Sequence, residues 1–261
     1  MREVAATVIL PRFQHLSADE VQQKSPGDLV TIADKESEIA LTRGLTALLP
    51  GSIVVGEEGV AADPKVIERV AHPGAVWIVD PVDGTNNFAA GKTPFAVMVA
   101  LVRDGEITAS WILDPIGDHL TLAEAGSGAY RDGVRVKTRT DNPGATALTG
   151  VVNGHYLPPE LRAEAAANVH KLGQVTNGHH CAGYEYPAVA LDEQQFTVFW
   201  RILPWDHAPG ALIVGEAGGT VLHLDGQPYR PTDSERGLLV ASNDEVWHTV
   251  RDALFPDTTF R

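Results

Sequence analysis

The chain has 261 residues, of which 44% are hydrophobic and 21% charged, enough for a large core in one compact unit or in two tightly joined halves. Its formal net charge of −14 argues against nucleic-acid binding and against docking on an anionic membrane, because both need a basic surface. Cys181 is the only cysteine, which excludes an internal disulfide and favours a reducing cytoplasm. We expect neither a membrane span nor a secretory leader.

The first half is predicted to combine helices with an antiparallel sheet. Apolar periodicity and turn residues predict these elements in order: a helix over 2–23 kinked at Pro11, a loop at 24–28, a helix from 31–34 to 49, a strand at 52–56, a short helix from Asp63-Pro64 and a strand at 75–80. Asp104-Gly105 and Asp132-Gly133 are hairpin signals, so residues 95–136 form an antiparallel meander.

The second half alternates strands with helices. Strands are expected near 146–152, 174–177, 196–200, 220–223 and 237–241, and helices near 159–172, 183–192, 206–217 and 243–254. We therefore divide the chain into an α+β half, 1–143, and an α/β half, 144–261. The acid-bearing strand ends come from both halves, so a functional site is expected between them.

Two carboxylates follow the buried strand at 75–80. Trp77-Ile78-Val79 leads into Asp80-Pro81-Val82-Asp83-Gly84-Thr85. Two acids held this close repel each other unless a cation lies between them, and hard divalent cations prefer such oxygen ligands. The backbone N–H groups of Gly84 and Thr85 could face an anion. Metal ligands beside an anion cradle indicate phosphate chemistry, although an ordinary Asp-rich turn is the alternative.

Acids occur in two matching contexts. Ile53-Val54-Val55-Gly56 is an apolar run that ends in Glu57 and Glu58, and Trp205-Asp206 opens an apolar helix. Asp206 is well placed to cap that helix, which is the structural alternative to a ligand role. The alternative for Glu57 and Glu58 is a solvated loop.

These residues together resemble the inositol monophosphatase family, whose members are lithium-sensitive, magnesium-dependent phosphatases related to fructose-1,6-bisphosphatase. The resemblance covers nearly the whole chain: Lys24-Ser25-Pro26 with Asp28 to Asp34, Gly56-Glu57-Glu58, the Asp80 to Thr85 run, and Trp205-Asp206 with Gly218-Gly219. The Asp80 to Thr85 run together with a distant Trp205-Asp206 is highly specific, whereas Gly56-Glu57-Glu58 alone is a weak signal. The implied fold is the layered αβαβα sugar-phosphatase fold.

The resemblance also implies a role for each matching residue. Two or three Mg²⁺ ions would be bound by Glu57, Asp80, Asp83, Asp206 and the backbone carbonyl of Val82. Gly84 and Thr85 would hold the phosphate, and Thr85 paired with Asp34 would help to deprotonate the attacking water. Glu58 would be a further metal contact or support one, and Lys24 would lie on a mobile loop that closes over the phosphate. The implied assembly is a homodimer.

The substrate is the least determined part. Inositol-preferring members have an acid seven residues before the Trp-Asp aspartate, whereas this chain has Phe199 there. Arg201 could instead meet a second anionic group, because its planar fork suits phosphate or carboxylate. His180 and Cys181 are expected in a pocket-lining loop, since adjacent His and Cys positions are not a zinc spacing.

A small phosphorylated metabolite is therefore the expected substrate. Inositol phosphate, histidinol phosphate, a sugar bisphosphate and a nucleotide 3′,5′-bisphosphate stay open. The non-enzymatic alternative is a metal-binding regulatory protein that retains the fold, because fold alone does not fix function.

Overall fold

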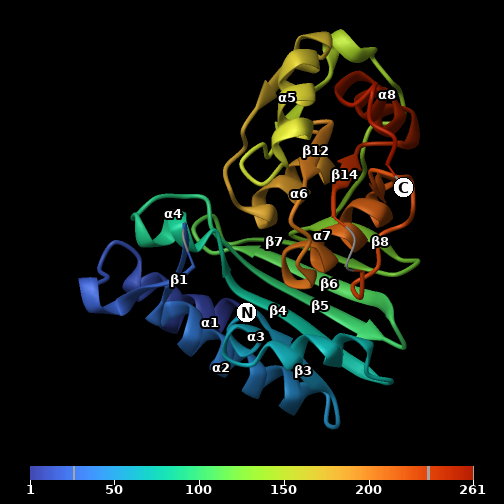
Figure 1. Cartoon of the computed structure of the whole chain (residues 1–261). Coiled ribbons are helices and arrows are strands. Elements are labelled where there is room, and N and C mark those ends of the chain that lie inside the picture. Colours follow the sequence, from blue (N-terminus) through green and yellow to red (C-terminus); the bar gives the residue numbers. More distant parts are fainter. Residues whose placement is uncertain (26, 234–235, 261) are drawn as a thin grey trace.

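The chain folds into five stacked layers. The computed structural model describes residues 1–25, 27–233 and 236–260. From the bottom of Figure 1 upward, the layers are N-terminal helices, a seven-stranded sheet, a central pair of helices, a five-stranded sheet and a top pair of helices. This order is the αβαβα arrangement that the family resemblance implied.

The seven-stranded sheet belongs to the first half of the chain. Its strands, in spatial order, are β3 (Ile53–Gly56), β4 (Ala75–Asp83), β5 (Ala96–Arg103), β6 (Glu106–Asp114), β7 (His119–Glu124), β8 (Gly128–Arg131) and β9 (Val134–Val136). All neighbouring strands are antiparallel except β3 and β4, which run parallel. The antiparallel meander is confirmed, and β4 continues three residues past its expected end, to Asp83.

The five-stranded sheet belongs to the second half. Its spatial order is β11 (Gln174–Thr176), β10 (Thr149–Val152), β12 (Phe196–Phe199), β14 (Leu238–Ala241) and β13 (Thr220–His223). Strand β10 is parallel to both of its neighbours, whereas β14 is antiparallel to both of its own. The sheet is therefore mixed, as expected for an α/β half.

Helices cover both sheets. They are α1 (Arg2–Val4), α2 (Ile32–Leu48), α3 (Glu57–Ala62), α4 (Thr85–Ala89), α5 (Pro159–Asn168), α6 (Ala182–Ala190), α7 (Pro204–Ala217) and α8 (Asp244–Leu254). Helices α6 and α7 lie between the two sheets, where Tyr186, Ile213 and Val214 are fully buried (Figure 1). A helix that is apolar on all sides belongs in such an interior position. This central layer brings the two halves together beside the ends of β4 and β12.

The expected long N-terminal helix is wrong beyond residue 12. Helical turns continue only to Arg12, Gln14 adopts a left-handed φ of 63°, and Val21–Ser25 forms β1, which pairs with β2 (Asp28–Thr31). Pro11 removes a helical donor, and Ser17 begins a new 3₁₀ turn with a capping box, so the helix cannot continue. Lys24 therefore lies in a strand rather than in the expected loop at 24–28, and Pro26 lies outside the described residues.

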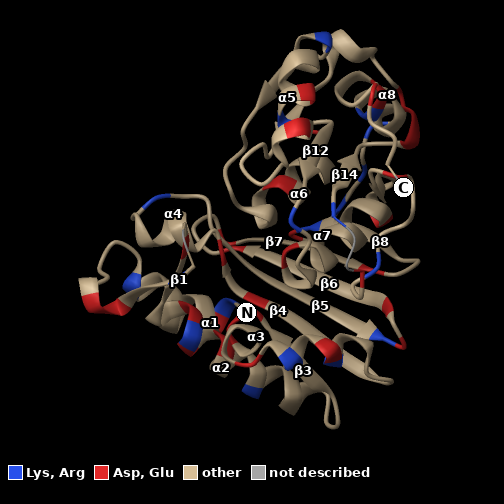
Figure 2. Ribbon diagram, in the orientation of Figure 1, with Lys and Arg blue, Asp and Glu red and all other residues tan. Residues whose placement is uncertain are grey.

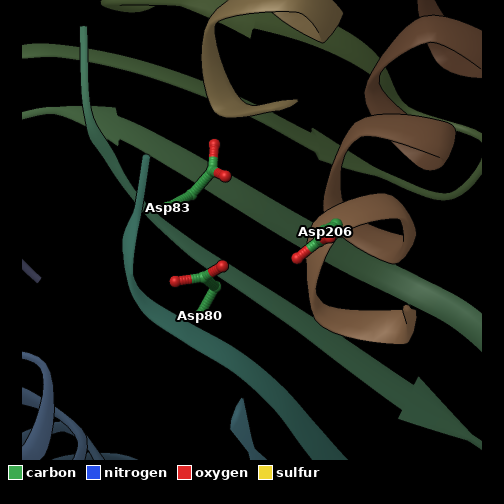
Figure 3. Close-up of side chains that lie close together, drawn as sticks. All are labelled: Asp80, Asp83 and Asp206. Atoms are coloured by element: carbon green, nitrogen blue, oxygen red, sulfur yellow. The ribbon is translucent and has the colours of Figure 1, made fainter. Parts of the chain in front are cut away.

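The proposed cap role of Asp206 is also wrong. Helix α7 begins at Pro204 with Leu203 as its N-cap, so Asp206 lies within the first turn. The first helical position needs no backbone N–H donor, so Pro204 is accommodated there and the helix begins two residues before Asp206. The first turn directs the Asp206 carboxylate away from a capping role and toward β4 (Figure 3).

Charges are spread over both halves. Figure 2 shows acidic residues on each half and also where the halves meet. Within the described residues, no helix has both the length and the apolar character needed to cross a bilayer.

Candidate active site

Three carboxylates converge where the two halves meet. One oxygen from each of Asp80, Asp83 and Asp206 lies within 4.8 Å of the others (Figure 3). Asp80 and Asp83 come from the end of β4, and Asp206 comes from the first turn of α7. Asp206 lies more than 120 positions after Asp83 in the sequence, so the fold itself assembles this cluster.

A local irregularity in β4 places both of its acids on one side. The pairing of β4 with β5 shifts register between Asp80 and Asp83, which is typical of a bulge near a functional site. Asp80 accepts a hydrogen bond from the backbone N–H of Val82 at 3.0 Å, and Asp83 accepts one from Gly183 at 2.6 Å. Both side chains are thereby held in place, with Asp80 only 2% exposed.

The cluster is electrostatically costly without a cation. Burial, followed by the neighbouring carboxylates, raises the pKa of Asp80 and of Asp206 well above the usual range. Burial also raises the pKa of Asp83 to about 6. Three clustered carboxylates that repel one another, largely removed from water, are the donor set that a hard divalent cation prefers, so these residues fit the metal implied by the sequence.

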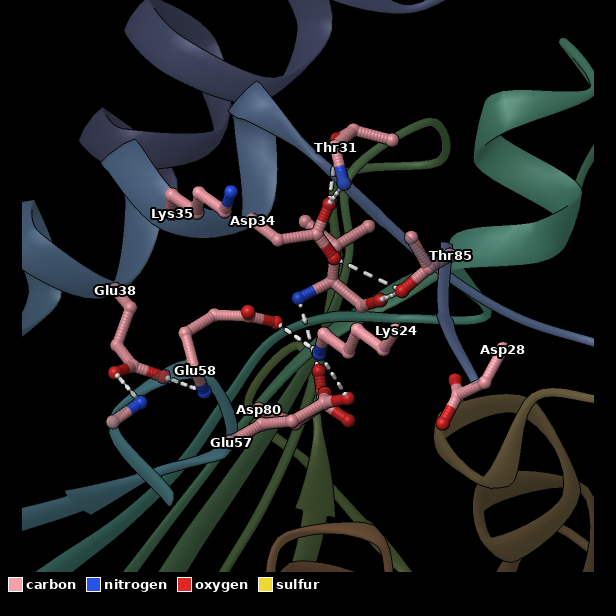
Figure 4. A network of polar contacts seen from close by, with 12 residues as sticks. Lys24, Asp28, Thr31, Asp34, Lys35, Glu38, Glu57, Glu58, Asp80 and Thr85 are labelled. Carbon is pink, nitrogen blue, oxygen red and sulfur yellow. Dashed lines mark hydrogen bonds and ion pairs between the residues drawn. The ribbon is translucent and has the colours of Figure 1, made fainter. Parts of the chain in front are cut away.

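Glu57 lies in the same cavity but is paired with a lysine. Lys24 Nζ is 2.9 Å from Glu57 Oε1 and 2.5 Å from Glu58 Oε1 (Figure 4). The three side chains are only 10–16% exposed. Burial lowers the pKa of Lys24, but the charges of the two glutamates outweigh it and the pKa is raised. The structure thus places Glu57, Glu58 and Lys24 together, with the Glu57 carboxylate bound to the ammonium group.

Glu38 holds the start of α3 and was not identified from the sequence. Its carboxylate accepts hydrogen bonds from the backbone N–H groups of Glu58, at 2.7 Å, and Gly59, at 2.8 Å (Figure 4). These are N–H groups that a helix start leaves without an intrahelical partner. A Cβ at Gly56 would lie 2.3 Å from this carboxylate, so the glycine permits the contact. Glu38 fixes the backbone that carries Glu57 and Glu58.

Gly84 forms a tight turn between β4 and α4. Its φ is +83°, a conformation that glycine adopts without strain. A Cβ at this position would also lie 3.0 Å from the Pro94 carbonyl and 3.3 Å from the Cys181 Cβ. The turn aims the start of α4, including Thr85, at the cavity, and the first N–H groups of a helix are available to an anion.

The hydroxyl of Thr85 joins the turn to α2. Thr85 Oγ1 lies 2.9 Å from Asp34 Oδ1 and 2.9 Å from the Val82 carbonyl, so its single proton can be donated to either (Figure 4). Asp34 also completes a capping box with Thr31, so the same carboxylate supports the start of α2 and pairs with Thr85. Burial raises the pKa of Asp34 to about 6, which leaves it a carboxylate at neutral pH.

A cavity of about 390 Å³ opens over the acids. One wall comes from the first half and carries Glu57, Asp80, Asp83 and the Gly84 turn. The other wall comes from the second half, and the residues that form it are Asn153, His155, Tyr156, His180, Cys181, Ala182, Phe199, Trp200, Arg201, Asp206 and His207. His180 and Cys181 thus lie at the cavity, as does Phe199, the residue seven positions before Asp206.

A buried relay holds the backbone beneath Arg201. His207 Nε2 donates to the Arg201 carbonyl at 3.0 Å, and Tyr186 Oη donates to His207 Nδ1 at 2.9 Å. Burial lowers the pKa of His207 to about 4, so the ring is neutral and this donor pattern fixes its tautomer. The first turn of α7 therefore supports the cavity wall as well as carrying Asp206.

Similar sequences were found by comparison with known proteins. The profile of the inositol monophosphatase family matches residues 1–257. An inositol-1-monophosphatase of Bacillus subtilis is 28% identical over 252 residues, which cover 96% of this chain and 91% of that protein. The Nus factor SuhB of Pseudomonas aeruginosa is also 28% identical, over 97% of this chain and 92% of its own.

A solved structure agrees in fold. The extragenic suppressor protein suhB from Bartonella henselae superposes with a TM-score of 0.84 at 25% identity, covering 98% of this chain and 96% of its own. The sequence profile, the layered fold and the clustered acids point the same way, and the chain belongs to the inositol monophosphatase family.

Proposed function

We propose that the protein is a magnesium-dependent phosphomonoesterase that hydrolyses a small phosphorylated metabolite. The observation that carries the proposal is the convergence of Asp80, Asp83 and Asp206 beside the Gly84 turn. Uncatalysed hydrolysis of phosphate monoesters needs enhancements of up to ~10²¹, while side-chain acid–base help supplies only about 10²–10⁴. Most of the enhancement must therefore come from charge neutralisation, which this acidic site supports.

Different residues of the site would bind the metal, hold the phosphate and accept the proton. Bound Mg²⁺, held by Asp80, Asp83, Asp206, Glu57 and the Val82 carbonyl, would neutralise phosphate charge and acidify the attacking water. The N–H groups of Gly84 and Thr85 would hold phosphate oxygens in the turn. The Thr85 hydroxyl would accept the proton of that water while it donates to Asp34 Oδ1, 2.9 Å away. In-line attack of that water on phosphorus, without a phosphoenzyme, fits this set of residues.

Other features of the family carry over with the same proposal. We infer that two or three Mg²⁺ ions are needed and that lithium inhibits. Glu58 supports the Glu57 side of the site through their shared Lys24 contact. The protein acts in the cytoplasm, without nucleic-acid or membrane partners.

A regulatory role is the second candidate, because one relative of equal identity is named a Nus factor. Such a role needs no turnover, whereas the present chain keeps the carboxylate cluster and the Thr85–Asp34 pair. We therefore favour an enzyme.

A phosphate-release screen tests the enzymatic proposal. The purified protein is incubated with Mg²⁺ and with inositol, histidinol, sugar and nucleotide phosphates in parallel. We expect Mg²⁺-dependent release from at least one substrate, lost on addition of a chelator and reduced by lithium. Absence of release from the whole panel, with Mg²⁺ bound in a separate calorimetric titration, would favour the regulatory role.

The state of assembly is a separate prediction. Because members of this family commonly pair, we expect a homodimer at micromolar concentration. Multi-angle light scattering measures the mass directly, and the monomer value is 27.9 kDa. A mass near that value across the micromolar range would contradict the prediction.

A further inference from the structure

The cavity wall formed by the second half carries a cation, Arg201, whose hydrogen-bond donors are not all used. Arg201 is the only lysine or arginine among the described residues that line the cavity. Its guanidinium lies 4.8 Å from the centre of the Tyr156 ring, a stacking contact that leaves the edge of the fork free. Asp28 Oδ2 is 3.6 Å from Arg201 Nη1, which is longer than a hydrogen bond. Within the described residues, the Arg201 guanidinium is thus held in orientation while some of its N–H donors have no acceptor.

A second polar group beside it is also unpaired. The Oδ1 atom of Asn153 is buried and has no hydrogen-bond partner in the described part of the chain. Asn153 follows β10, Arg201 follows β12, and these two strands are parallel neighbours, so their carboxyl ends meet at the same edge of the sheet. Buried polar atoms are rarely left without a partner, and an amide oxygen only accepts, so this atom indicates a hydrogen-bond donor on a ligand, such as a hydroxyl close to the anionic group.

The backbone of this wall is rigid. The Arg201 carbonyl accepts from His207, which in turn accepts from Tyr186, and the backbone N–H of Asn153 donates to the Val198 carbonyl at 3.1 Å. Side chains on such fixed elements hold their position toward a ligand with little loss of entropy on binding.

We propose that Arg201 and Asn153 form a second subsite that binds an anionic group, phosphate or carboxylate, on the leaving side of the substrate. This inference rests on the proposed phosphatase function and narrows its substrate class. The scissile phosphate would lie at the Gly84 turn and the second anion at Arg201, across the same cavity. Arg201 pairs with such an anion through charge-assisted bonds, and Asn153 Nδ2 donates to it or Oδ1 accepts from an adjacent hydroxyl.

Substitution of Asp28 should have an effect opposite to that of substituting Arg201 if Arg201 binds an anion, but not if Arg201 has only a structural role. Asp28 faces Arg201 and repels an anion, so Asp28→Asn should favour a doubly anionic substrate. If Arg201 served only to pair with Asp28, removing either partner would have the same consequence. The two substitutions therefore separate ligand binding from structural pairing.

The test compares kcat/KM for three phosphate esters that differ in the charge of the leaving side: fructose 1,6-bisphosphate, myo-inositol 1-phosphate and histidinol phosphate. The wild type should prefer the bisphosphate, then the neutral polyol, then the amine. Arg201→Met should lower kcat/KM for the bisphosphate about 10- to 100-fold, the range for a hydrogen bond to a charged group, and change the polyol far less. Arg201→Lys should recover part of the loss, and Asp28→Asn should raise the bisphosphate value.

Arg43→Met is the matched control, because Arg43 is exposed on α2 and does not line the cavity. A nucleoside 3′,5′-bisphosphate and a phosphorylated carboxylic acid then distinguish a phosphate from a carboxylate as the second anion. If the wild type hydrolyses all three esters equally, or Arg201→Met leaves their ratio unchanged, the subsite is refuted while the phosphatase function stands. If no ester is hydrolysed, it is the proposed function that fails.

Discussion

Asp83→Asn is expected to abolish magnesium-dependent phosphate release almost completely. The substitution keeps the volume of the side chain and an oxygen that can accept from the Gly183 N–H, which now binds Asp83 at 2.6 Å. It removes one of three clustered charges, and a metal at such a site supplies several kcal/mol of charge stabilisation. We therefore expect kcat/KM to fall by about 10³-fold or more at saturating Mg²⁺, since each 1.36 kcal/mol is tenfold.

The control is Asp141→Asn, which changes the same charge on an exposed carboxylate that pairs with Arg139. Its turnover should match the wild type. Circular dichroism and the elution volume should be unchanged for both variants, so that a loss in Asp83→Asn is chemical. Turnover within a few-fold of the wild type at high Mg²⁺ would remove Asp83 from the ligand set.

Much of this site was predictable because strand ends are visible in the sequence. The apolar run before Asp80 defines β4, and buried strands deliver the residues that follow them to one rim of a sheet. Asp206 was found from its neighbours Trp205 and Pro204, although the helix begins earlier than its capping preference implied. The change of pattern after residue 143 predicted an α+β half and an α/β half, whereas the layered arrangement was implied by the family resemblance.

The contacts that the sequence did not predict are long-range and depend on side-chain direction. Nothing in the spacing of Glu38 relates it to Glu58, because the contact depends on how α2 packs beside β3. The strand at Val21–Ser25 was missed since five polar-rich residues have no strand periodicity of their own and form β1 only against β2. Tertiary pairing overrode the local helical pattern there.

The acid cluster should also lower the stability of the metal-free protein relative to a variant that lacks one of the clustered charges. Burial, together with neighbouring carboxylates, raises the pKa of Asp80 in the folded state. A raised folded-state pKa contributes stability that is complete below the unfolded value of 3.8 and is lost as pH rises through the folded value. At pH 8 the folded protein therefore holds a buried charge that the unfolded chain would solvate freely.

Asp80→Asn should accordingly raise the melting temperature of the chelator-treated protein at pH 8, by about 2–4 °C for each kcal/mol relieved. The amide oxygen can still accept from the Val82 N–H, which now lies 3.0 Å from the carboxylate, so the fold keeps this contact. In Mg²⁺ the order should reverse, because ligand at 100 times its Kd stabilises the wild type by about 2.7 kcal/mol and the variant has lost a ligand.

Differential scanning fluorimetry with chelator and with Mg²⁺, at pH 8 and pH 5, gives four melting temperatures for each protein. The gain in the metal-free variant should shrink at pH 5, where protonation already relieves part of the repulsion in the wild type. Asp141→Asn should show no such pattern, since that carboxylate is exposed. A metal-free Asp80→Asn protein that melts below the wild type at pH 8 would mean that the acids are held by contacts worth more than their repulsion. The cluster would then be a structural feature rather than a site kept at a cost for a cation.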